Sequence, residues 1–278
     1  MKVLVIGKDG QVGSELLRII DGSNGTSRKK GSGIYLDLTN LNSIEDTILK
    51  EMPDVVVNAA ALTNVDGCED NKKDAFLING KAVGHMARAC SVTGSYFIHI
   101  STDYVFDGEN GNYSEQDTPN PINYYGISKL MGEAYALSYD DSLVVRTSGV
   151  YGIKMNFPLY VVKTLNEGGT VNCIDSYYSP IHATLLAESI KELIEKRMYG
   201  ILNVSGERLS RYDFALKIKK ALDIKTGNVV LVNNSSNLKA RRPYDSSLVN
   251  DKAKKILSTK FYDTGKALGY LAKYGEVK

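Results

Sequence analysis

The sequence predicts an α/β fold in which helices cover both faces of a parallel sheet. Short apolar segments of strand length alternate with amphipathic helical segments from the N-terminus to about residue 150, and the series begins with a strand. This order is typical of a doubly wound parallel sheet. Beyond that point the alternation becomes irregular. We therefore expect one unit at 1–150 and a smaller C-terminal lobe at 151–278, with later segments returning to the main sheet.

Two periodicities define the expected elements. Short unbroken apolar runs indicate buried strands, whereas apolar residues that recur once per helical turn indicate helices. The expected strands are 2–6, 33–38, 53–58, 96–102, 142–147, 200–205 and 229–232. The expected helices are 15–20, 42–50, 74–92, 123–140, 183–196 and 212–222.

Composition limits the classes of partner. The 278 residues are 43% hydrophobic, which is enough to bury a full core. The net charge is +2, from 34 basic and 32 acidic residues, so no nucleic-acid partner is indicated. The apolar runs are too short to span a membrane, and the first residues lack the features of a signal peptide. We expect a cytoplasmic protein with no membrane partner.

The cysteines and histidines do not indicate a metal site. Cys68, Cys90 and Cys173 are scattered, without a Cys-x-x-Cys pair, which favours free thiols in a reducing compartment. The three histidines form no ligand pattern, and we interpret them as structural or surface residues.

A glycine-rich turn follows the first expected strand directly. Gly7, Gly10 and Gly13 are spaced G-x-x-G-x-x-G, and an amphipathic helix comes next. Glycines let the backbone approach a pyrophosphate closely, and a helix N-terminus offers free N–H groups and partial positive charge. The strand-turn-helix order favours a phosphate site over an ordinary tight turn.

A basic segment lies where the second strand of such a unit meets the adenosine ribose. An acidic residue there selects a free 2′-hydroxyl, and an arginine accommodates a 2′-phosphate. The chain has Arg28 and Lys29, and no acidic residue until Asp37. This favours NADP over NAD, although a solvated basic loop is the alternative.

Tyr125 and Lys129 are the candidate proton-transfer pair. Four residues apart on an expected helix, they share one face. A nearby ammonium group favours the phenolate and lowers the pKa of the phenol, which then becomes usable as a general acid or base. Thr102 ends an expected strand, as Gly7 and Ala59 do, so these groups lie at one edge of the sheet.

Segments along nearly the whole chain resemble the dTDP-4-dehydrorhamnose reductase family of extended short-chain dehydrogenases/reductases. The Ser-Thr-Asp-Tyr-Val-Phe run at 101–106 and the late Arg-Arg-Pro at 241–243 are its most specific motifs. The other matching segments are 7–13, 57–61, 63–66, 125–129 and 146–148.

The resemblance implies a Rossmann-like cofactor domain and a substrate-binding lobe at 151–278. It further implies that NADPH, with NADH as the alternative, reduces a nucleotide-linked 4-keto-6-deoxy sugar, dTDP-4-dehydrorhamnose to dTDP-L-rhamnose. Tyr125 would donate the proton, Thr102 would hydrogen-bond the carbonyl, and Lys129 would hold the nicotinamide ribose. The sequence leaves open whether the chain forms a homodimer.

The same resemblance assigns the binding residues. The cofactor would meet Gly7, Gly10, Gln11, Val12, Gly13, Arg28, Asp37, Leu38, Ala59, Ala60, Ala61, Tyr125 and Lys129. The substrate would meet Thr63, Val65, Asp66, Thr102, Asp103, Tyr104 and Arg242, with Arg242 pairing the diphosphate.

Two departures from the family pattern fall on the substrate side. Many relatives carry a tryptophan where this chain has Gly149, and the chain has no tryptophan at all. Tyr177 or Tyr178 is the expected replacement for that aromatic wall. The region 175–181 also carries bulky tyrosines where relatives tend to have a glycine and a Pro-Thr pair.

Two other functions stay open at this point. One is a cofactor-binding regulatory subunit similar to that of methionine adenosyltransferase. The other is a sugar-nucleotide dehydratase or epimerase. Dehydratases of this kind typically have Asp-Glu after the catalytic threonine, and here Tyr104 follows Asp103.

Overall fold

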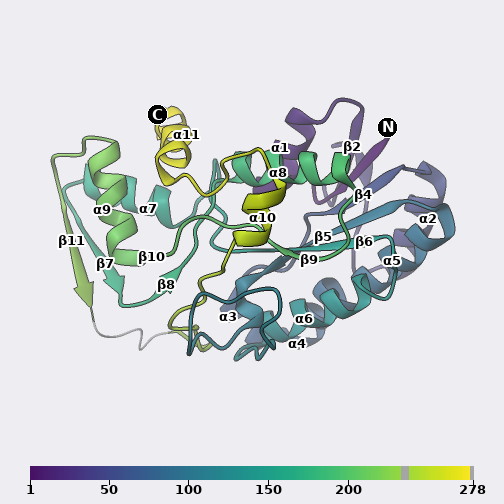
Figure 1. Cartoon of the computed structure of the whole chain (residues 1–278), viewed down its shortest axis with the longest axis horizontal. Coiled ribbons are helices and arrows are strands. Elements are labelled where there is room, and N and C mark those ends of the chain that lie inside the picture. Colours follow the sequence, from purple (N-terminus) through teal and green to yellow (C-terminus); the bar gives the residue numbers. More distant parts are fainter. Residues whose placement is uncertain (233–237, 276–278) are drawn as a thin grey trace.

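The computed structural model describes residues 1–232 and 238–275. Its centre is a seven-stranded sheet in the order β3-β2-β1-β4-β5-β6-β9, in which all neighbouring strands are parallel (Figure 1). The predicted doubly wound parallel sheet is therefore confirmed. The strands of this sheet are β1 (Val3–Ile6), β2 (Ser23–Ser27), β3 (Ile34–Tyr35), β4 (Val55–Asn58), β5 (Tyr96–Thr102), β6 (Ser142–Thr147) and β9 (Gly200–Asn203).

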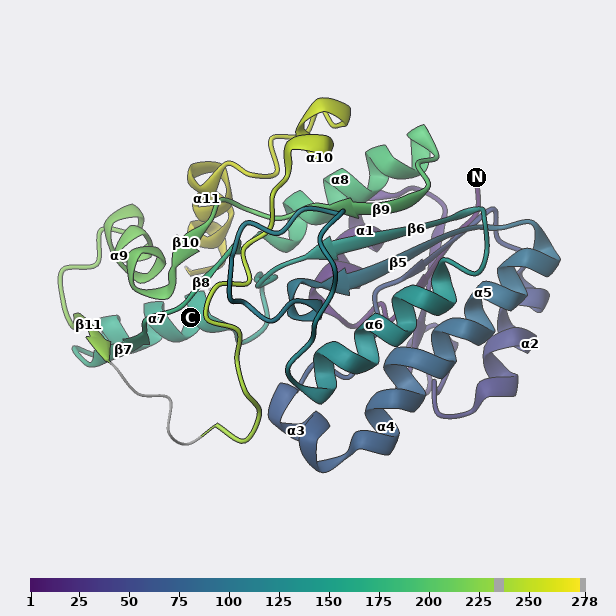
Figure 2. The same cartoon turned by 60° about the horizontal axis from the view of Figure 1, so that its bottom comes forward.

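Helices cover both faces of the sheet because its strands are apolar on both sides. Val3 and Val5 pack with the helices α1 (Gln11–Ile19) and α8 (Ala183–Lys196). Leu4 and Ile6 point the other way, into the core under α2 (Leu41–Glu51), α5 (Ala82–Thr93) and α6 (Tyr124–Ala136). Figure 2 shows α2, α5 and α6 side by side across that face.

The second half of the chain adds β9 and α8 to the main sheet and forms small sheets and helices beside it, mostly at the left of Figure 1. Strand β7 pairs with β11 in parallel, and β8 pairs with β10 antiparallel. These elements are α7 (Phe157–Asn166), β7 (Thr170–Ile174), β8 (Tyr177–Tyr178), β10 (Leu209–Ser210), α9 (Arg211–Ala221), β11 (Asn228–Val232), α10 (Asp251–Ile256) and α11 (Thr264–Gly275). The division at about residue 150 stays a prediction.

The long helix expected at 74–92 is interrupted. After α3 (Val65–Asp70), the chain forms α4 (Lys72–Phe76), one π-helical turn η1 (Leu77–Lys81) and then α5. The wide turn points the Asn79 side chain inward. Its Oδ1 accepts the Leu62 N–H at 2.8 Å, and its Nδ2 donates to the Leu62 carbonyl oxygen at 3.1 Å and to Ser128 Oγ at 3.0 Å. Helix α6 crosses closely here, since a Cβ on Gly132 would lie 2.3 Å from the Asn79 carbonyl oxygen. The break therefore coincides with a buried polar side chain at this helix crossing.

Smaller differences concern the ends of elements. Helix α1 begins at Gln11 and not at residue 15, because its first turn is built on the glycine segment. The strand expected at 33–38 is only Ile34–Tyr35, because Asp37 turns the chain by accepting hydrogen bonds from Thr39.

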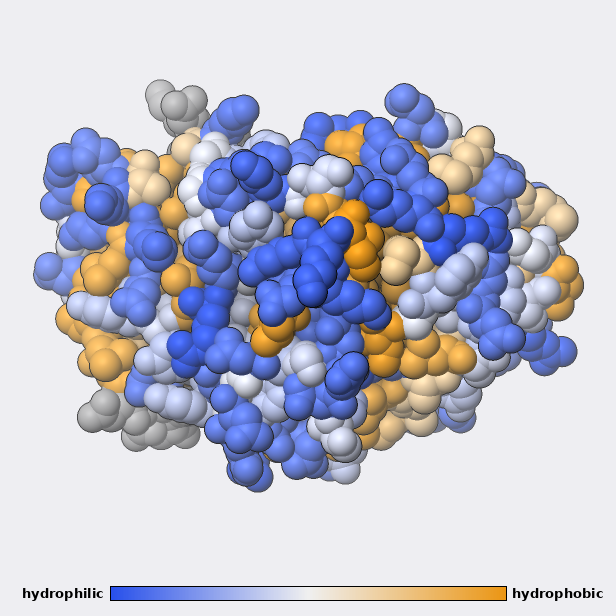
Figure 3. Space-filling view, in the orientation of Figure 1, coloured by the Kyte–Doolittle hydropathy of each residue, from blue (hydrophilic) through white to orange (hydrophobic). Residues whose placement is uncertain are grey.

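On the face drawn in Figure 3, hydrophilic residues predominate and hydrophobic residues lie between them.

Candidate active site

A cavity of about 1040 Å³ runs along the carboxyl ends of the central strands. It extends from the turn after β1, past the end of β4, to the end of β5 and the first turn of α6. Strand β1 lies between β2 and β4, where the strand order reverses, which is where ligands bind in open parallel sheets. The fold therefore places a large hollow where the sequence predicted a cofactor.

The glycine turn forms one end of this cavity. Gly7 has φ +88°, and a Cβ on it would lie 2.7 Å from Ala60 Cβ, so the turn lies against the end of β4. A Cβ on Gly13 would lie 2.3 Å from the Gly7 carbonyl oxygen, which shows how tightly α1 packs on the turn. Gly10 precedes α1 and supplies no side-chain cap. The first-turn N–H groups of α1 thus face the cavity without a competing side chain.

The basic segment lies at the cavity end beside β2. Strand β2 ends at Ser27, and Arg28 and Lys29 follow it along the wall. Asp37 lines the same wall after β3. Hydrogen bonds from Thr39 lower the pKa of Asp37, and the charge of Arg28 adds to the effect. The acidic group therefore stays ionised close to an arginine.

Tyr125 and Thr102 lie at the opposite end of the cavity. Asn123 caps α6 by accepting the Gly126 N–H at 2.8 Å, which places Tyr125 in the first turn. A Cβ on Gly126 would lie 2.1 Å from the Tyr104 carbonyl oxygen. Glycine at this position lets α6 approach the end of β5, and the rings of Tyr104 and Tyr125 pack edge to face at 5.9 Å.

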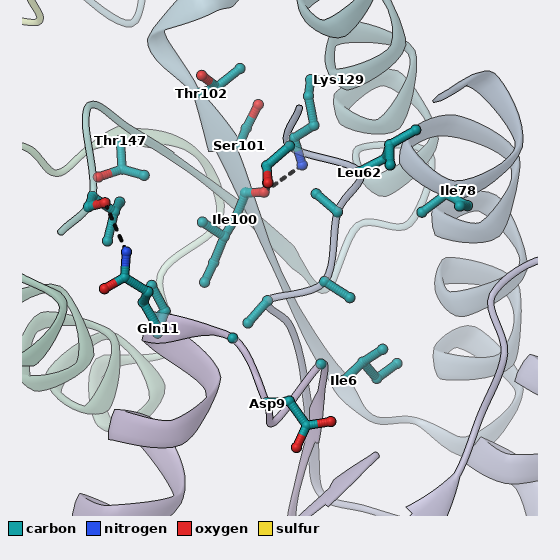
Figure 4. Close-up of a pocket in the computed structure, with 18 of the residues that line it drawn as sticks. Ile6, Asp9, Gln11, Leu62, Ile78, Ile100, Ser101, Thr102, Lys129 and Thr147 are labelled. Carbon is teal, nitrogen blue, oxygen red and sulfur yellow. Dashed lines mark hydrogen bonds between the residues drawn. The ribbon is translucent and has the colours of Figure 1, made fainter. Parts of the chain in front are cut away.

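The pKa of Tyr125 differs from the sequence-based expectation. Burial raises this pKa, and a hydrogen bond with Thr102 opposes the increase only in part. Lys129 is not among the groups that shift this pKa, and its Nζ donates to the Ile100 carbonyl oxygen at 2.7 Å (Figure 4). The expectation that the pKa of Tyr125 is lowered is wrong for this arrangement, because burial outweighs the groups that oppose it. The phenol is instead held protonated at neutral pH.

Lys129 belongs to a buried polar chain that sequence analysis missed. Its Nζ lies 3.2 Å from His99 Nε2, and Asn58 Nδ2 lies 3.0 Å from His99 Nδ1. The Ala60 N–H donates to Asn58 Oδ1 at 3.1 Å and so orients that amide. Burial and then the charge of Lys129 hold the pKa of His99 well below its usual value. Burial lowers the pKa of Lys129 to about 8, although Glu133 opposes the shift.

Asp103 is a buried carboxylate that joins three segments. Thr102 Oγ1 donates to Oδ1 at 3.0 Å, and Ser148 and Ser246 donate to Oδ2 at 2.7 and 2.5 Å. Burial raises the pKa of Asp103, while these hydroxyl groups oppose the increase. The single hydroxyl proton of Thr102 is therefore committed to Asp103 in this arrangement.

The cavity brings together most of the predicted residues. Those that line it are Gly7, Gly10, Gln11, Val12, Arg28, Asp37, Leu38, Ala59, Ala60, Ala61, Thr63, Val65, Thr102, Asp103, Tyr104, Tyr125 and Lys129. Gln11 also reaches the Val150 carbonyl oxygen at 3.4 Å and so closes one side of the cavity (Figure 4).

Three predicted residues lie outside the cavity wall. Gly13 packs behind the glycine turn. Asp66 and Arg242 form an ion pair at 3.0 Å. Asp66 also accepts the Ala240 N–H at 3.0 Å, and Arg242 donates to the Ala240 carbonyl oxygen at 3.1 Å. This pair fastens the late loop to α3.

Tyr178 and Arg211 line the cavity beyond Tyr104. Arg211 had no signal in the sequence, because the helix expected there began one residue later. Of the two tyrosines considered, Tyr178 lies on the cavity wall. Tyr177 instead contacts Tyr244, at 5.8 Å between ring centres, and the Arg208 guanidinium at 4.0 Å.

Other features of the described chain bear on the class of protein. Within residues 1–232 and 238–275, no cluster of three or more His, Cys, Asp or Glu side chains is arranged to hold a metal ion. Over the same ranges, every helix is too short or too polar to cross a bilayer. The three cysteines are free and buried.

Comparisons with known proteins agree with this architecture. A family model described as the RmlD substrate binding domain matches residues 1–273. A dTDP-4-dehydrorhamnose reductase of Salmonella typhimurium is 38% identical, over 77% of this chain and 76% of the relative. A crystal structure of a hypothetical dTDP-4-dehydrorhamnose reductase from Sulfolobus tokodaii matches with a TM-score of 0.90 and 52% identity, over 95% of this chain and 97% of that one. The dTDP-4-dehydrorhamnose reductase of Bacillus anthracis, solved in complex with NADP, matches with a TM-score of 0.89 and 28% identity, over 96% of this chain and 97% of that one.

Proposed function

The chain belongs to the dTDP-4-dehydrorhamnose reductase family, and we propose that it reduces a nucleotide-linked 4-keto-6-deoxy sugar with NADPH. The most specific form of this reaction is dTDP-4-dehydrorhamnose to dTDP-L-rhamnose. One observation carries the proposal: a protonated phenol, Tyr125, and the Thr102 hydroxyl lie on the wall of the cavity that begins at the glycine turn.

The residues present fit a dinucleotide. The turn at Gly7 and Gly10 leaves room for a pyrophosphate, and the N-terminus of α1 offers N–H groups to it. The small side chains of Ala59 and Ala60 leave space along the end of β4. Arg28 after β2 suits a 2′-phosphate, as in NADPH, because its planar guanidinium can bind two phosphate oxygens at once.

When bound, NADPH supplies the hydride for the sugar carbonyl carbon. Tyr125 donates its proton to the oxygen of that carbonyl, where negative charge develops. The phenol is protonated at neutral pH and so carries the proton that this direction of reaction requires, while its raised pKa makes it a weaker acid than a free tyrosine. For Thr102 to donate to the same oxygen, its hydroxyl proton has to turn away from Asp103.

Lys129 keeps one of the two roles expected of it, that of holding the cofactor. Its amine is fixed beneath the site by the Ile100 carbonyl oxygen and by His99. From this position it would hold the nicotinamide ribose, as the family pattern implies, and burial together with its charge keeps His99 neutral. We assign Lys129 to cofactor binding and not to activation of Tyr125.

The two alternative functions fit these contacts less well. A regulatory subunit needs no proton donor, yet Thr102, Tyr125 and Lys129 all line one cavity. A dehydratase needs an acid beside Asp103, and Tyr104 occupies that position. Asp103 itself is engaged by three hydroxyl groups, which leaves it poorly placed to remove a proton from a substrate.

The test is oxidation of NADPH by the purified protein with dTDP-4-dehydrorhamnose. Tyr125→Phe should lower kcat by about 10²- to 10⁴-fold and leave the Kd for NADPH nearly unchanged. Tyr124→Phe is the matched control, because Tyr124 packs on Phe76 and Lys72 away from the cavity. Tight NADPH binding without turnover would favour the regulatory subunit. Oxidised cofactor retained through purification would favour the epimerase or dehydratase.

A further inference from the structure

Arg211 is the first residue of α9 and extends into the cavity from the C-terminal half of the chain. Its backbone is fixed on both sides. The Arg211 N–H donates to the Ser176 carbonyl oxygen at 3.0 Å, and Ser210 caps the helix by accepting the Asp213 N–H at 2.9 Å. Its guanidinium lies 4.6 Å from the centre of the Tyr178 ring and 5.5 Å from that of Phe157. The side chain is thus held by aromatic faces.

The charge of Arg211 lacks a carboxylate partner among the described residues, whereas two neighbouring arginines have one. Arg242 pairs with Asp66 at 3.0 Å, and Arg208 pairs with Asp245 at 2.7 Å. Neither of these two arginines lines the cavity, and Arg211 does. A guanidinium that faces a cavity, lies on aromatic rings and has no carboxylate beside it in the described chain is well suited to bind an anion.

Tyr178 provides the support, because residue 149 is glycine. A Cβ on Gly149 would lie 2.5 Å from the Tyr178 ring, so this ring fills the space that a side chain at residue 149 would need. Tyr178 is only 6% exposed. Its hydroxyl group and the Thr147 hydroxyl group are buried without a hydrogen-bond partner in the described chain, and both residues line the cavity. Unpaired buried hydroxyl groups at a cavity wall indicate a site for a polar ligand.

Tyr104 connects this wall to the proton donor. Arg211 opposes the effect of burial on the pKa of Tyr104, partly through a hydrogen bond, so the two side chains are adjacent. On its other side, the Tyr104 ring packs against Tyr125. A nucleotide sugar carries its diphosphate on C1, across the sugar ring from C4. An anion site beyond Tyr104 therefore lies on the side that C1 faces when C4 meets Tyr125.

We propose that Arg211, supported by Tyr178, binds the diphosphate of the nucleotide-sugar substrate, and that Arg242 has a structural part. The proposal rests on the proposed function for the identity of the substrate. The diphosphate contact is thus assigned to Arg211, which lies outside the family motifs. Arg242 belongs to a motif, but Asp66 already neutralises its charge.

The test measures binding of dTDP, which requires no turnover. Titration calorimetry of the full chain with dTDP should show Arg211→Gln weakening binding by about 10- to 100-fold, the size expected for loss of a charge-assisted contact. Arg211→Lys should restore part of the affinity, because it keeps the charge but not the planar fork. The Kd for NADPH should stay within about threefold of the wild-type value in both variants. Arg241→Gln is the matched control, since Arg241 is exposed and lies outside the cavity wall.

Several results would overturn the proposal. The first is an unchanged affinity for dTDP in Arg211→Gln. The second is a larger loss of dTDP affinity in Arg242→Gln than in Arg211→Gln. The third is an Arg211→Gln variant that loses affinity for NADPH only. Thermal unfolding of each variant separates a lost contact from a lost fold. The outcomes for the proposed function are distinct. If the wild-type protein fails to reduce dTDP-4-dehydrorhamnose while dTDP binding depends on Arg211, the sugar is wrong and the diphosphate site stands. If the wild-type protein reduces this sugar normally and Arg211→Gln has an unchanged KM, the proposed function stands and the diphosphate site is wrong.

Discussion

Replacement of Gly126 by alanine should weaken catalysis much more than cofactor binding. The added Cβ would lie 2.1 Å from the Tyr104 carbonyl oxygen and 2.9 Å from Pro121 Cβ. Bringing the first contact to at least 3.0 Å requires a movement of about 0.9 Å between α6 and the segment after β5. Tyr125 is the adjacent residue, and Thr102 ends β5. The movement therefore increases the separation of the two groups that act on the carbonyl oxygen.

The size of the effect follows from this displacement. A misplacement of about 1 Å costs on the order of 10²-fold in rate, or about 2.7 kcal/mol of transition-state stabilisation. Overpacking costs about 1–3 kcal/mol of stability, while alanine in a helix regains about 0.5–1 kcal/mol. We expect kcat/KM for the sugar to fall about 100-fold and Tm to fall by a few degrees, with a much smaller loss of NADPH affinity because Lys129 lies on the same helix.

Steady-state kinetics, fluorescence titration of NADPH and thermal unfolding measure the three quantities. Gly269→Ala is the control, because a Cβ on this glycine of α11 meets no atom within 4 Å. The reasoning fails if Gly126→Ala keeps wild-type kcat/KM while remaining folded. It also fails if cofactor affinity falls as much as the rate, since the glycine turn lies at the other end of the cavity.

Two further predictions concern the cofactor and pH. Arg28→Ala should weaken NADPH binding by about 10-fold or more and NADH binding hardly at all, and equal losses would remove Arg28 from the 2′-phosphate. Burial lowers the pKa of His182 from 6.5 to about 4, and its Nδ1 caps α8 by accepting the Thr184 N–H at 3.2 Å. Because the pKa of His182 is lower in the folded state than in the unfolded state, neutral His182 contributes fully to the free energy of unfolding above about pH 6.5. This contribution is lost as the pH falls towards 4, and the free energy of unfolding is lower by about 2 kcal/mol at pH 5. His182→Asn, which caps without titrating, should flatten the dependence of Tm on pH between 8 and 5, and parallel curves would contradict this.

Local signals in the sequence predicted the cofactor end of the site. An apolar strand, a glycine turn and an amphipathic helix are contiguous, and parallel strands bring their carboxyl ends to one edge. Gly7, Ala59 and Thr102 therefore line one cavity although they are far apart in the chain. The reductase family, the parallel sheet and NADP use followed from the same motifs.

The remaining features depend on contacts between segments that are distant in the sequence. Lys129 turns towards Ile100 because β5 brings a carbonyl oxygen and His99 beneath it, which no spacing within α6 reveals. Arg242 belongs to a specific motif, yet Asp66 neutralises its charge. Arg211 reaches the cavity only through the packing of α9, in the half of the chain where periodicity was weakest.

The contacts of Asp103 have a consequence for biosynthesis of the protein. The segments that form the glycine turn and the first six strands of the main sheet are all made within the first 147 residues. The carboxylate that holds the Thr102 hydroxyl, however, receives its last donor from Ser246. The segments that carry the dinucleotide cradle are thus synthesised about a hundred residues before Ser246. The growing chain cannot arrange the reducing centre fully until nearly nine-tenths of the 278 residues have been made.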